Sequence, residues 1–263
     1  MTILRSRDNP RVRRWRRLIA DRQLRRRTRR AWIEGVRLVA AYFDVHGAPL
    51  TLILDAQASG NREIAALVSR TGIAPVVLSS SLFAELADTQ TPQGVAAEIA
   101  IPRTPDLAAG ITHCVFLDGV GDPGNLGAIL RSAAAFAVPE VVLGSGCADP
   151  WSPKVLRAAM GAHFALRLRE SAELSRRFAQ FAGERICTVP RGGTPLQDID
   201  LRGPHAWAFG GEGRGVSEAM LQAATLRACI PIDPATESLN VAVAASLCLY
   251  EAARQRRAPP PHQ

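Results

Sequence analysis

The sequence predicts an α/β protein of two domains, the second built on a mainly parallel sheet with helices on both faces. Strand-like and helix-like patterns alternate in two series along the 263 residues, and a proline-containing stretch with little pattern separates them. Because 47% of the residues are hydrophobic, each domain can bury a core. We therefore expect a small domain over residues 1–100, a linker over 101–111, a second domain over 112–257 and a frayed tail over 258–263.

The first domain begins with an arginine-rich helix. Its apolar stripe, which includes Trp15 and Leu18, is expected to continue as a helix into AWIEGVRLV at residues 31–39. Shorter segments then alternate in type. The expected helices are 35–43, 61–69 and 81–87, and the expected strands are 50–54, 75–78 and 94–99.

The second domain repeats this alternation with longer helices. The expected strands are 113–118, 140–143, 164–168, 185–189, 205–209 and 228–232. The expected helices are 125–137, 153–160, 171–181 and 238–257. Strands that alternate with helices favour a parallel sheet covered on both faces.

The charge is strongly basic and concentrated at the N-terminus. The formal net charge is +8, and thirteen arginines between Arg5 and Arg30 are opposed only by Asp8 and Asp21. Such a segment favours a polyanionic partner, because each phosphate that it neutralises releases counterions. A solvated arginine-rich face is the alternative. The arginines that we expect to contact RNA are Arg11, Arg13, Arg14, Arg25 and Arg26.

The cysteines and the hydrophobic segments indicate the cellular compartment of the protein. The five cysteines form no C-x-x-C pair and no metal-like spacing, so we expect buried free thiols in a reducing compartment, the cytoplasm. No stretch has the eighteen or more apolar residues of a membrane span, and the N-terminus has no apolar signal core. The N-terminal arginines resemble a mitochondrial transit peptide, but the apolar stripe between them makes this segment part of the mature fold.

The first motif is LDGVGDPGNLGAILR at residues 117–131. Its glycines match the G-x-G-x-x-G of dinucleotide-binding folds, but Pro123 interrupts the turn and no acidic residue ends the next strand. Asn125 either caps the following helix or has a function. Arg131 has glycine and alanine as its helical neighbours, which leaves room for a phosphate or carboxylate beside its guanidinium. An ordinary surface arginine is the alternative.

Two further motifs follow. FGGEGRGVS at residues 209–217 is a glycine-rich loop without the G-K-[ST] ending of a phosphate-binding loop. In IPIDPATESLNVAVA at 230–244, Ser238 is the expected N-cap of the last helix, and Asn240 lies where capping alone would not require it. The expected packing stripe of that helix is Leu239, Val243, Leu247 and Tyr250. A glycine-rich turn and a capped helix are the structural alternatives.

The order and content of the three motifs resemble the SpoU/TrmH branch of the SPOUT RNA methyltransferases. EGVRLV at residues 34–39 and TPQGV at 91–95 resemble the L30e-like substrate-binding domain of that family, so the resemblance spans about residues 5–257. It implies that the C-terminal domain is a trefoil knot. It also implies transfer of a methyl group from S-adenosylmethionine, without a metal, to a ribose 2′-hydroxyl of structured RNA, with 23S ribosomal RNA favoured, and a homodimer formed through the C-terminal domain.

By matching positions, the resemblance also assigns residues. The implied catalytic residues are Arg131, Asn125, Glu212, Ser238 and Asn240. The implied cofactor-binding residues are Phe209, Gly210, Gly211, Ile230 and Leu239. Many relatives have a serine where this chain has Ala159, so that position receives no polar role, whereas Lys154 and Arg157 stay candidates for phosphate contact or for a solvated helix face.

The proton acceptor and the RNA are less determined. A guanidinium is normally never deprotonated, so an RNA phosphate positioned by Arg131 is a better acceptor of the hydroxyl proton than Arg131 itself. Transfer RNA as substrate, methylation of a base nitrogen and a non-catalytic RNA-binding or ribosome-assembly protein with this fold are the alternatives. An NAD enzyme would leave the second and third motifs unexplained.

Overall fold

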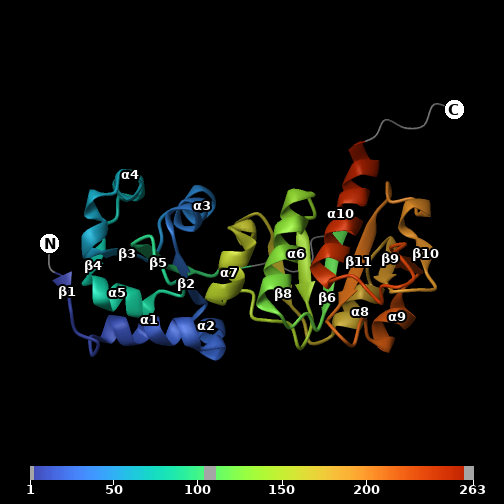
Figure 1. Cartoon of the computed structure of the whole chain (residues 1–263), viewed down its shortest axis with the longest axis horizontal. Helices are drawn as coiled ribbons and strands as arrows, with labels where there is room; N and C mark the ends of the chain where they lie inside the picture. The colour runs from blue at the N-terminus through green and yellow to red at the C-terminus, as the bar shows by residue number, and fades with distance from the viewer. Residues whose placement is uncertain (1–2, 104–110, 258–263) are drawn as a thin grey trace. The chain divides into compact units, whose positions relative to one another are not determined.

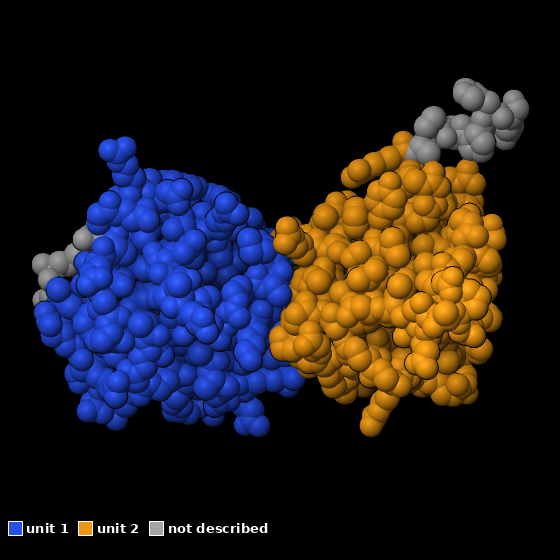
Figure 2. Space-filling model, in the orientation of Figure 1, with its two compact units in different colours: residues 1–103, 149–164 blue, residues 104–148, 165–263 orange. Residues whose placement is uncertain are grey.

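A computed structural model describes residues 3–103 and 111–257 of the chain (Figure 1). The expected tail 258–263 and most of the expected linker lie outside the described residues. The chain forms two compact units, one of residues 1–103 with 149–164 and the other of 104–148 with 165–263 (Figure 2). The sequence placed 149–164 in the second domain, because its helix continues the strand-helix alternation there. Its contacts place it in the first unit.

The first unit contains a five-stranded mixed sheet. The strands in sheet order are β1 (Ile3–Leu4), β4 (Val76–Leu78), β3 (Thr51–Asp55), β5 (Val95–Ala100) and β2 (Arg30–Glu34). The helices are α1 (Pro10–Ala20), α2 (Arg22–Thr28), α3 (Val36–His46), α4 (Arg62–Thr71), α5 (Ser80–Leu86) and α7 (Pro153–Ala159). β5 pairs antiparallel with both of its neighbours, and the other pairs are parallel.

Successive side chains of this sheet enter two different cores. Trp32 and Ala96 pack with α1 and α5, whereas Ile33 and Ala97 pack with α3, α4 and Leu156 of α7. This burial on both faces explains why the helix expected through residues 31–33 is wrong. A continuous apolar run fits a strand between two layers as well as it fits a helix, so periodicity could not distinguish them. The helix starts only after Gly35, whose φ of 96° favours glycine.

The segment 149–164 is joined to the first unit by a buried ion pair. The Arg25 side chain is 5% exposed and its guanidinium lies 2.7 Å from the carboxylate of Asp149. The same guanidinium donates to the carbonyl oxygens of Leu18 and Ile19. Arg25 is therefore a structural residue, and our expectation that it contacts RNA is wrong. Its charge is used inside the unit, where a buried cation needs these partners.

His163 gives this unit a pH dependence. It is 2% exposed, and its Nε2 donates to the carbonyl oxygen of Pro150 at 2.6 Å. Burial lowers the pKa of His163 to about 4, although this hydrogen bond acts in the opposite direction. Because the unfolded chain binds a proton at its ordinary pKa near 6.5, the contribution of His163 is complete above pH 6.5 and is lost as the pH falls from 6.5 to 4.

We expect the free energy of unfolding to decrease by up to about 3 kcal/mol over that interval through this residue. Urea unfolding of the parent and of His163→Gln at several pH values measures the effect as the difference between the two profiles. Parallel profiles between pH 6.5 and 4 would contradict the prediction.

The second unit contains a seven-stranded sheet in which every pair is parallel. The strands in sheet order are β10 (Thr194–Pro195), β12 (Leu226–Cys229), β9 (Glu184–Thr188), β11 (His205–Gly210), β6 (His113–Asp118), β7 (Glu140–Leu143) and β8 (Arg167–Glu170). The helices are α6 (Pro123–Ala135), α8 (Leu174–Ala179), α9 (Glu218–Ala223) and α10 (Val241–Arg257). The expected mainly parallel sheet is confirmed.

The sheet is covered by helices on both faces (Figure 1). Phe116 and Ala208 face the core that contains α8 and α9. On the other face α6 packs beside α10, where the hydroxyls of Ser132 and Ser246 are 2.7 Å apart. Two strands begin two or more residues away from the expected start, at Arg167 and at Leu226. The residues after Cys229 that we read as strand are instead a long loop to α10.

The apolar residues of α10 divide differently from the expectation. Val243, Leu247 and Tyr250 are 48%, 41% and 54% exposed, so the expected packing stripe is wrong. The buried face consists of small residues and one leucine: Ala242, Ala245, Cys248, Leu249, Ala252 and Ala253. Small side chains let α10 lie close to its neighbours, and this leaves the larger apolar residues on the outside.

Candidate functional site

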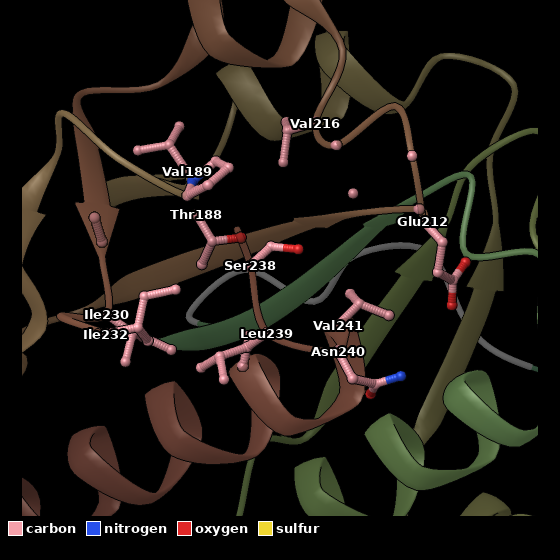
Figure 3. Close-up of a pocket in the computed structure, with 17 residues that line it drawn as sticks. Thr188, Val189, Glu212, Val216, Ile230, Ile232, Ser238, Leu239, Asn240 and Val241 are labelled. Carbon is pink, nitrogen blue, oxygen red and sulfur yellow. The ribbon is translucent and has the colours of Figure 1, made fainter. Parts of the chain in front are cut away.

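A cavity of about 380 Å³ lies in the second unit, where the loops after β9, β11 and β12 meet (Figure 3). Loops that follow neighbouring parallel strands leave the sheet at the same edge, which is the usual place for a ligand in an α/β sheet. The cavity includes seven residues that the sequence singled out: Gly210, Gly211, Glu212, Ile230, Ser238, Leu239 and Asn240. Its size falls within the range of pockets that take drug-sized molecules.

The glycine loop after β11 owes its shape to backbone packing. A Cβ at Gly210 would overlap the carbonyl carbon of Gly215, and one at Gly211 would overlap the carbonyl oxygen of Gly119. Gly211 N–H donates to Asp118 at 2.9 Å, and Gly211 and Gly215 form an antiparallel bridge. These glycines are required because the loop folds tightly onto itself and onto the turn after β6.

The cavity has an apolar end and a polar end. Ile230, Ile232 and Leu239 lie at one end, and Glu212 and Asn240 lie at the other (Figure 3). Val189, in the loop after β9, also lines the cavity, and the sequence reading missed this loop because it carries no motif. Only its position after a strand of the parallel sheet could have indicated it.

Asn125, Glu212 and Asn240 come from three distant motifs and form one hydrogen-bonded chain. The Asn125 side-chain amide donates to the carboxylate of Glu212. The Asn240 amide donates to Oδ1 of Asn125 at 3.0 Å. Oδ1 of Asn240 in turn accepts the N–H of Ala242 and that of Val243. The network fixes the orientation of both amides and connects the starts of α6 and α10 to the glycine loop.

Helix capping corrects two expectations. α6 is capped by Asp122, whose carboxylate accepts the N–H of Asn125 at 2.8 Å. The Asn125 side chain is thereby left for Glu212. At α10 the cap is Asn240, not Ser238, because the helix begins at Val241. Ser238 is exposed and lines the cavity.

Arg131 lies apart from this network. It is on the exposed side of α6 and does not line the cavity, and its side chain makes no hydrogen bond or ion pair with any residue that the structure describes. Its guanidinium is therefore available to a ligand. Phe209, expected to contact a cofactor, is fully buried and stacks on Trp207 with ring centroids 5.9 Å apart. Its side chain supports the loop from behind, and it does not line the cavity.

The basic residues expected to contact RNA differ in their surroundings. Arg11, Arg13 and Arg26 are exposed on α1 and α2. Arg14 is 43% exposed and lies 2.5 Å from the buried carboxylate of Glu98. Lys154 and Arg157 are exposed on α7 and belong to the first unit.

The five thiols are free, as expected. Cys114, Cys147, Cys187 and Cys248 are buried, and Cys229 is partly exposed. Burial raises the pKa of Cys187 to about 12, so this thiol stays protonated. Across residues 3–103 and 111–257, three or more histidine, cysteine, aspartate or glutamate side chains do not gather where they could hold a metal ion. In the same residues, every helix is too short or too polar to cross a membrane.

Family comparisons cover most of the chain. Residues 112–250 match the SpoU rRNA methylase family, and residues 9–97 match the MRM3-like substrate-binding domain. The chain is 32% identical to the 23S rRNA (guanosine(2553)-2′-O)-methyltransferase RlmP of Bacillus subtilis, over 95% of this chain and 98% of the relative. It is 39% identical to an uncharacterized tRNA/rRNA methyltransferase of Synechocystis, over 68% and 67% of the two chains.

Solved structures with the same architecture include two methyltransferases. A crystal structure of an RNA 2′-O ribose methyltransferase aligns over 97% of this chain and 99% of its own, with a TM-score of 0.83 and 30% identity. An S-adenosylmethionine-bound rRNA methyltransferase from Sinorhizobium meliloti aligns over 96% and 97%, with a TM-score of 0.83 and 28% identity.

Proposed function

Because this chain belongs to the SpoU rRNA methylase family, we propose that it transfers a methyl group from S-adenosylmethionine to a ribose 2′-hydroxyl in 23S ribosomal RNA. The observation that carries the proposal is the cavity at the edge of the parallel sheet, with the Asn125, Glu212 and Asn240 network at its polar end. The full-length similarity to RlmP supports the choice of ribosomal RNA. We also propose that the enzyme acts in the cytoplasm, where bacterial ribosomes are modified.

The lining of the cavity fits the methyl donor. Ile230 and Leu239 offer apolar contacts to an adenine ring and a thioether, and the glycine loop offers backbone groups for the polar atoms. The donor supplies an electrophilic methyl group on a sulfonium. We further propose that the loops lining the cavity are the crossing loops of a trefoil knot, which would explain why they contact one another so closely.

The chain's own residues would align the RNA and direct its proton. In the reaction a bond forms between the ribose 2′-oxygen and the methyl carbon, the bond between sulfur and that carbon breaks, and the hydroxyl proton leaves. Arg131 would hold the adjacent RNA phosphate, which accepts the proton, and the network of Asn125 and Asn240 would position the sugar. Alignment is the main contribution, because the methyl donor is already activated.

Incubation of the purified enzyme with radiolabelled donor and 23S or transfer RNA tests the proposal. We expect label in 23S RNA, resistant to alkaline cleavage at one nucleotide because the 2′-hydroxyl is blocked. Label only in transfer RNA would move the substrate assignment. Label on a base would overturn the reaction assignment. A protein that binds no donor by calorimetry would instead be a non-catalytic RNA-binding protein.

The exposed stripe of α10 leads us to propose a homodimer. Val243, Leu247 and Tyr250 recur at intervals of four and three residues, so they share one helix face. Tyr250 also lies edge-on to Phe136, which extends this apolar surface. A patch of this kind favours association with another protein surface. We expect Leu247→Asp to convert a dimer into a folded monomer in sedimentation velocity, with Arg227→Asp, at an exposed residue of β12, as a control that leaves the dimer intact. A parent protein that sediments as a monomer would refute the dimer.

Two arginines of the same helical region should respond oppositely to substitution. Arg13→Ala is expected to leave the free energy of unfolding within about 0.5 kcal/mol of the parent, because Arg13 is exposed. The same Arg13→Ala variant should weaken RNA binding and reduce the magnitude of the slope of log K against log[salt] by about 0.7–0.9. Arg25→Ala removes one partner of a buried ion pair and should destabilise the protein by about 3–5 kcal/mol. Urea unfolding and RNA titrations at several salt concentrations measure both. Equal stability of the two variants would contradict the assignment of Arg25.

A further inference from the structure

A second cavity, of about 260 Å³, lies wholly within the first unit. Its walls come from β2 and the start of α3, from the segment between residues 88 and 93, and from α7. The function proposed above uses none of these walls. The volume is below the roughly 300–1,000 Å³ of pockets that take drug-sized molecules, so the cavity suits a single ring system better than a folded segment.

One wall is the open edge of a sheet. β2 is the last strand of its sheet, and it pairs only with β5. Gly35 N–H donates to the carbonyl oxygen of Val95, and the carbonyl oxygen of Arg29 accepts the N–H of Ile101. The odd-numbered residues of β2 therefore direct their backbone groups toward β5. The even-numbered residues Trp32 and Glu34 direct their N–H and C=O groups to the opposite side, away from β5. No described residue forms a hydrogen bond to these groups on that side.

Trp32 is 0% exposed, so neither its side chain nor its backbone is open to a ligand. Its side chain packs into the core with Trp15, on the face of the sheet opposite to Ile33 and Leu38. Glu34 is partly exposed and lines the cavity, and its N–H and C=O present a donor and an acceptor on the same edge of β2. A heterocyclic base with adjacent donor and acceptor atoms on its edge is a matched ligand for such a pair.

The apolar wall is well suited to the flat face of a ring. Leu38 and Leu156 form its buried part. Met160 is 50% exposed at the end of α7, which it terminates with a left-handed φ of 52°. A flexible thioether at a cavity mouth adapts to rings of different shape.

The charges around this cavity fit an anionic ligand. Arg37 is exposed and forms no ion pair within the part of the chain that the structure describes. The carboxylate of Glu34 is already occupied, because it accepts the N–H of Asp88 at 3.0 Å and the hydroxyl of Thr89 at 2.7 Å. Arg157 pairs with the Asp88 carboxylate. The remaining unpaired charge is positive and belongs to Arg37.

We propose that this cavity binds one unpaired nucleobase of the RNA substrate. The base edge hydrogen-bonds to the backbone of Glu34, its face lies against Leu38 and Met160, and Arg37 contacts a neighbouring phosphate. The inference rests on the proposed function for the identity of the RNA. It adds that the first unit recognises an extruded nucleotide, and that a continuous duplex would leave this site empty.

The methionines provide a direct probe. The chain has three, of which Met160 borders this cavity and Met220 is buried in the second unit. In the full-length protein labelled with ¹³C-methyl methionine, the four nucleoside 5′-monophosphates are titrated, with assignment by Met160→Leu. We expect saturable shifts of the Met160 methyl signal with at least one of them, and no shift of Met220.

Two variants and two other probes complete the test. Thr91→Trp, at an exposed residue of the cavity wall, should fill the cavity and abolish the shift. Arg37→Ala should weaken binding of the monophosphate about tenfold and leave binding of the nucleoside unchanged, whereas Arg62→Ala, on α4 outside the cavity, should change neither. Inorganic phosphate alone should not shift Met160.

The proposal is overturned if no monophosphate shifts Met160 at millimolar concentration, or if a folded Thr91→Trp protein keeps the shift. It is also overturned if only an extended tripeptide binds, since the open strand edge would then receive a peptide strand. These titrations need neither methyl donor nor turnover. A negative titration would therefore not contradict the proposed methyl transfer, and a negative methyl-transfer assay would not contradict binding of a base in this cavity.

Discussion

Arg131→Ala is expected to lower the rate of methyl transfer by about 10²–10⁴-fold while the protein stays folded and binds the donor normally. The structure explains why the rate should fall while folding and donor binding are kept. The Arg131 side chain is exposed, has no partner among the described residues and does not line the cavity proposed to bind the donor. Its loss should therefore leave packing and donor affinity intact and remove only the group that holds the RNA phosphate.

Single-turnover kinetics with saturating donor, together with calorimetry for donor binding, make this measurement. Arg131→Lys serves as the conservative variant, and it should recover part of the rate because it keeps the charge without the planar fork. Arg254→Ala, which removes an exposed arginine of α10 paired with Glu251, is the matched control and should keep the parental rate. Near-parental turnover of Arg131→Ala would refute the role assigned to this residue.

Gly210→Ala should have a comparable effect by a different route. A methyl group at this position would overlap the backbone of Gly215, so the glycine loop that lines the cavity must change its shape. We expect donor affinity to fall at least about 100-fold, with a destabilisation of about 1–3 kcal/mol from the overpacked loop. Gly203→Ala is the control, because a Cβ there meets open space and the backbone is not left-handed.

Calorimetry with the donor and urea unfolding measure both quantities. The two readouts matter because a protein that unfolds would also lose binding. If Gly210→Ala is folded and binds the donor as tightly as Gly203→Ala, the loop is not part of the donor site.

Much of the fold could be predicted because most strands here are buried between helices and carry strong apolar patterns. His113–Asp118 and Glu140–Leu143 were predicted to the residue. The failures have physical causes. Ala31, Trp32 and Ile33 are all apolar since both faces of β2 are covered, so their pattern has no period that distinguishes a strand from a helix. The exposed side of α10 carries apolar residues at the spacing typical of a buried helix face, so the pattern alone could not show which face is buried.

The sequence predicted the site residues that belong to a motif. It predicted less well the roles that depend on which side chains meet in three dimensions. The glycines and Asn240 stand out in the sequence, yet only the structure places Asn240 as the cap of α10 and as a donor to Asn125. The loop of Val189 was missed, since apolar residues after a strand carry no chemical signature. Arg25 was misassigned because a buried and an exposed arginine are identical in composition, and Asp149 lies far away in the chain.

The ion pair between Arg25 and Asp149 limits how this protein can be divided. The first unit needs α7 and Asp149, which are encoded after the first two strands of the second unit. A fragment that stops at residue 103 would retain Arg25 as a buried cation without its carboxylate, and Tyr42 would lose its edge-on contact with Phe164. Gene truncation, domain exchange between relatives or expression of residues 1–103 by themselves should therefore yield insoluble product unless residues 149–164 are supplied as well.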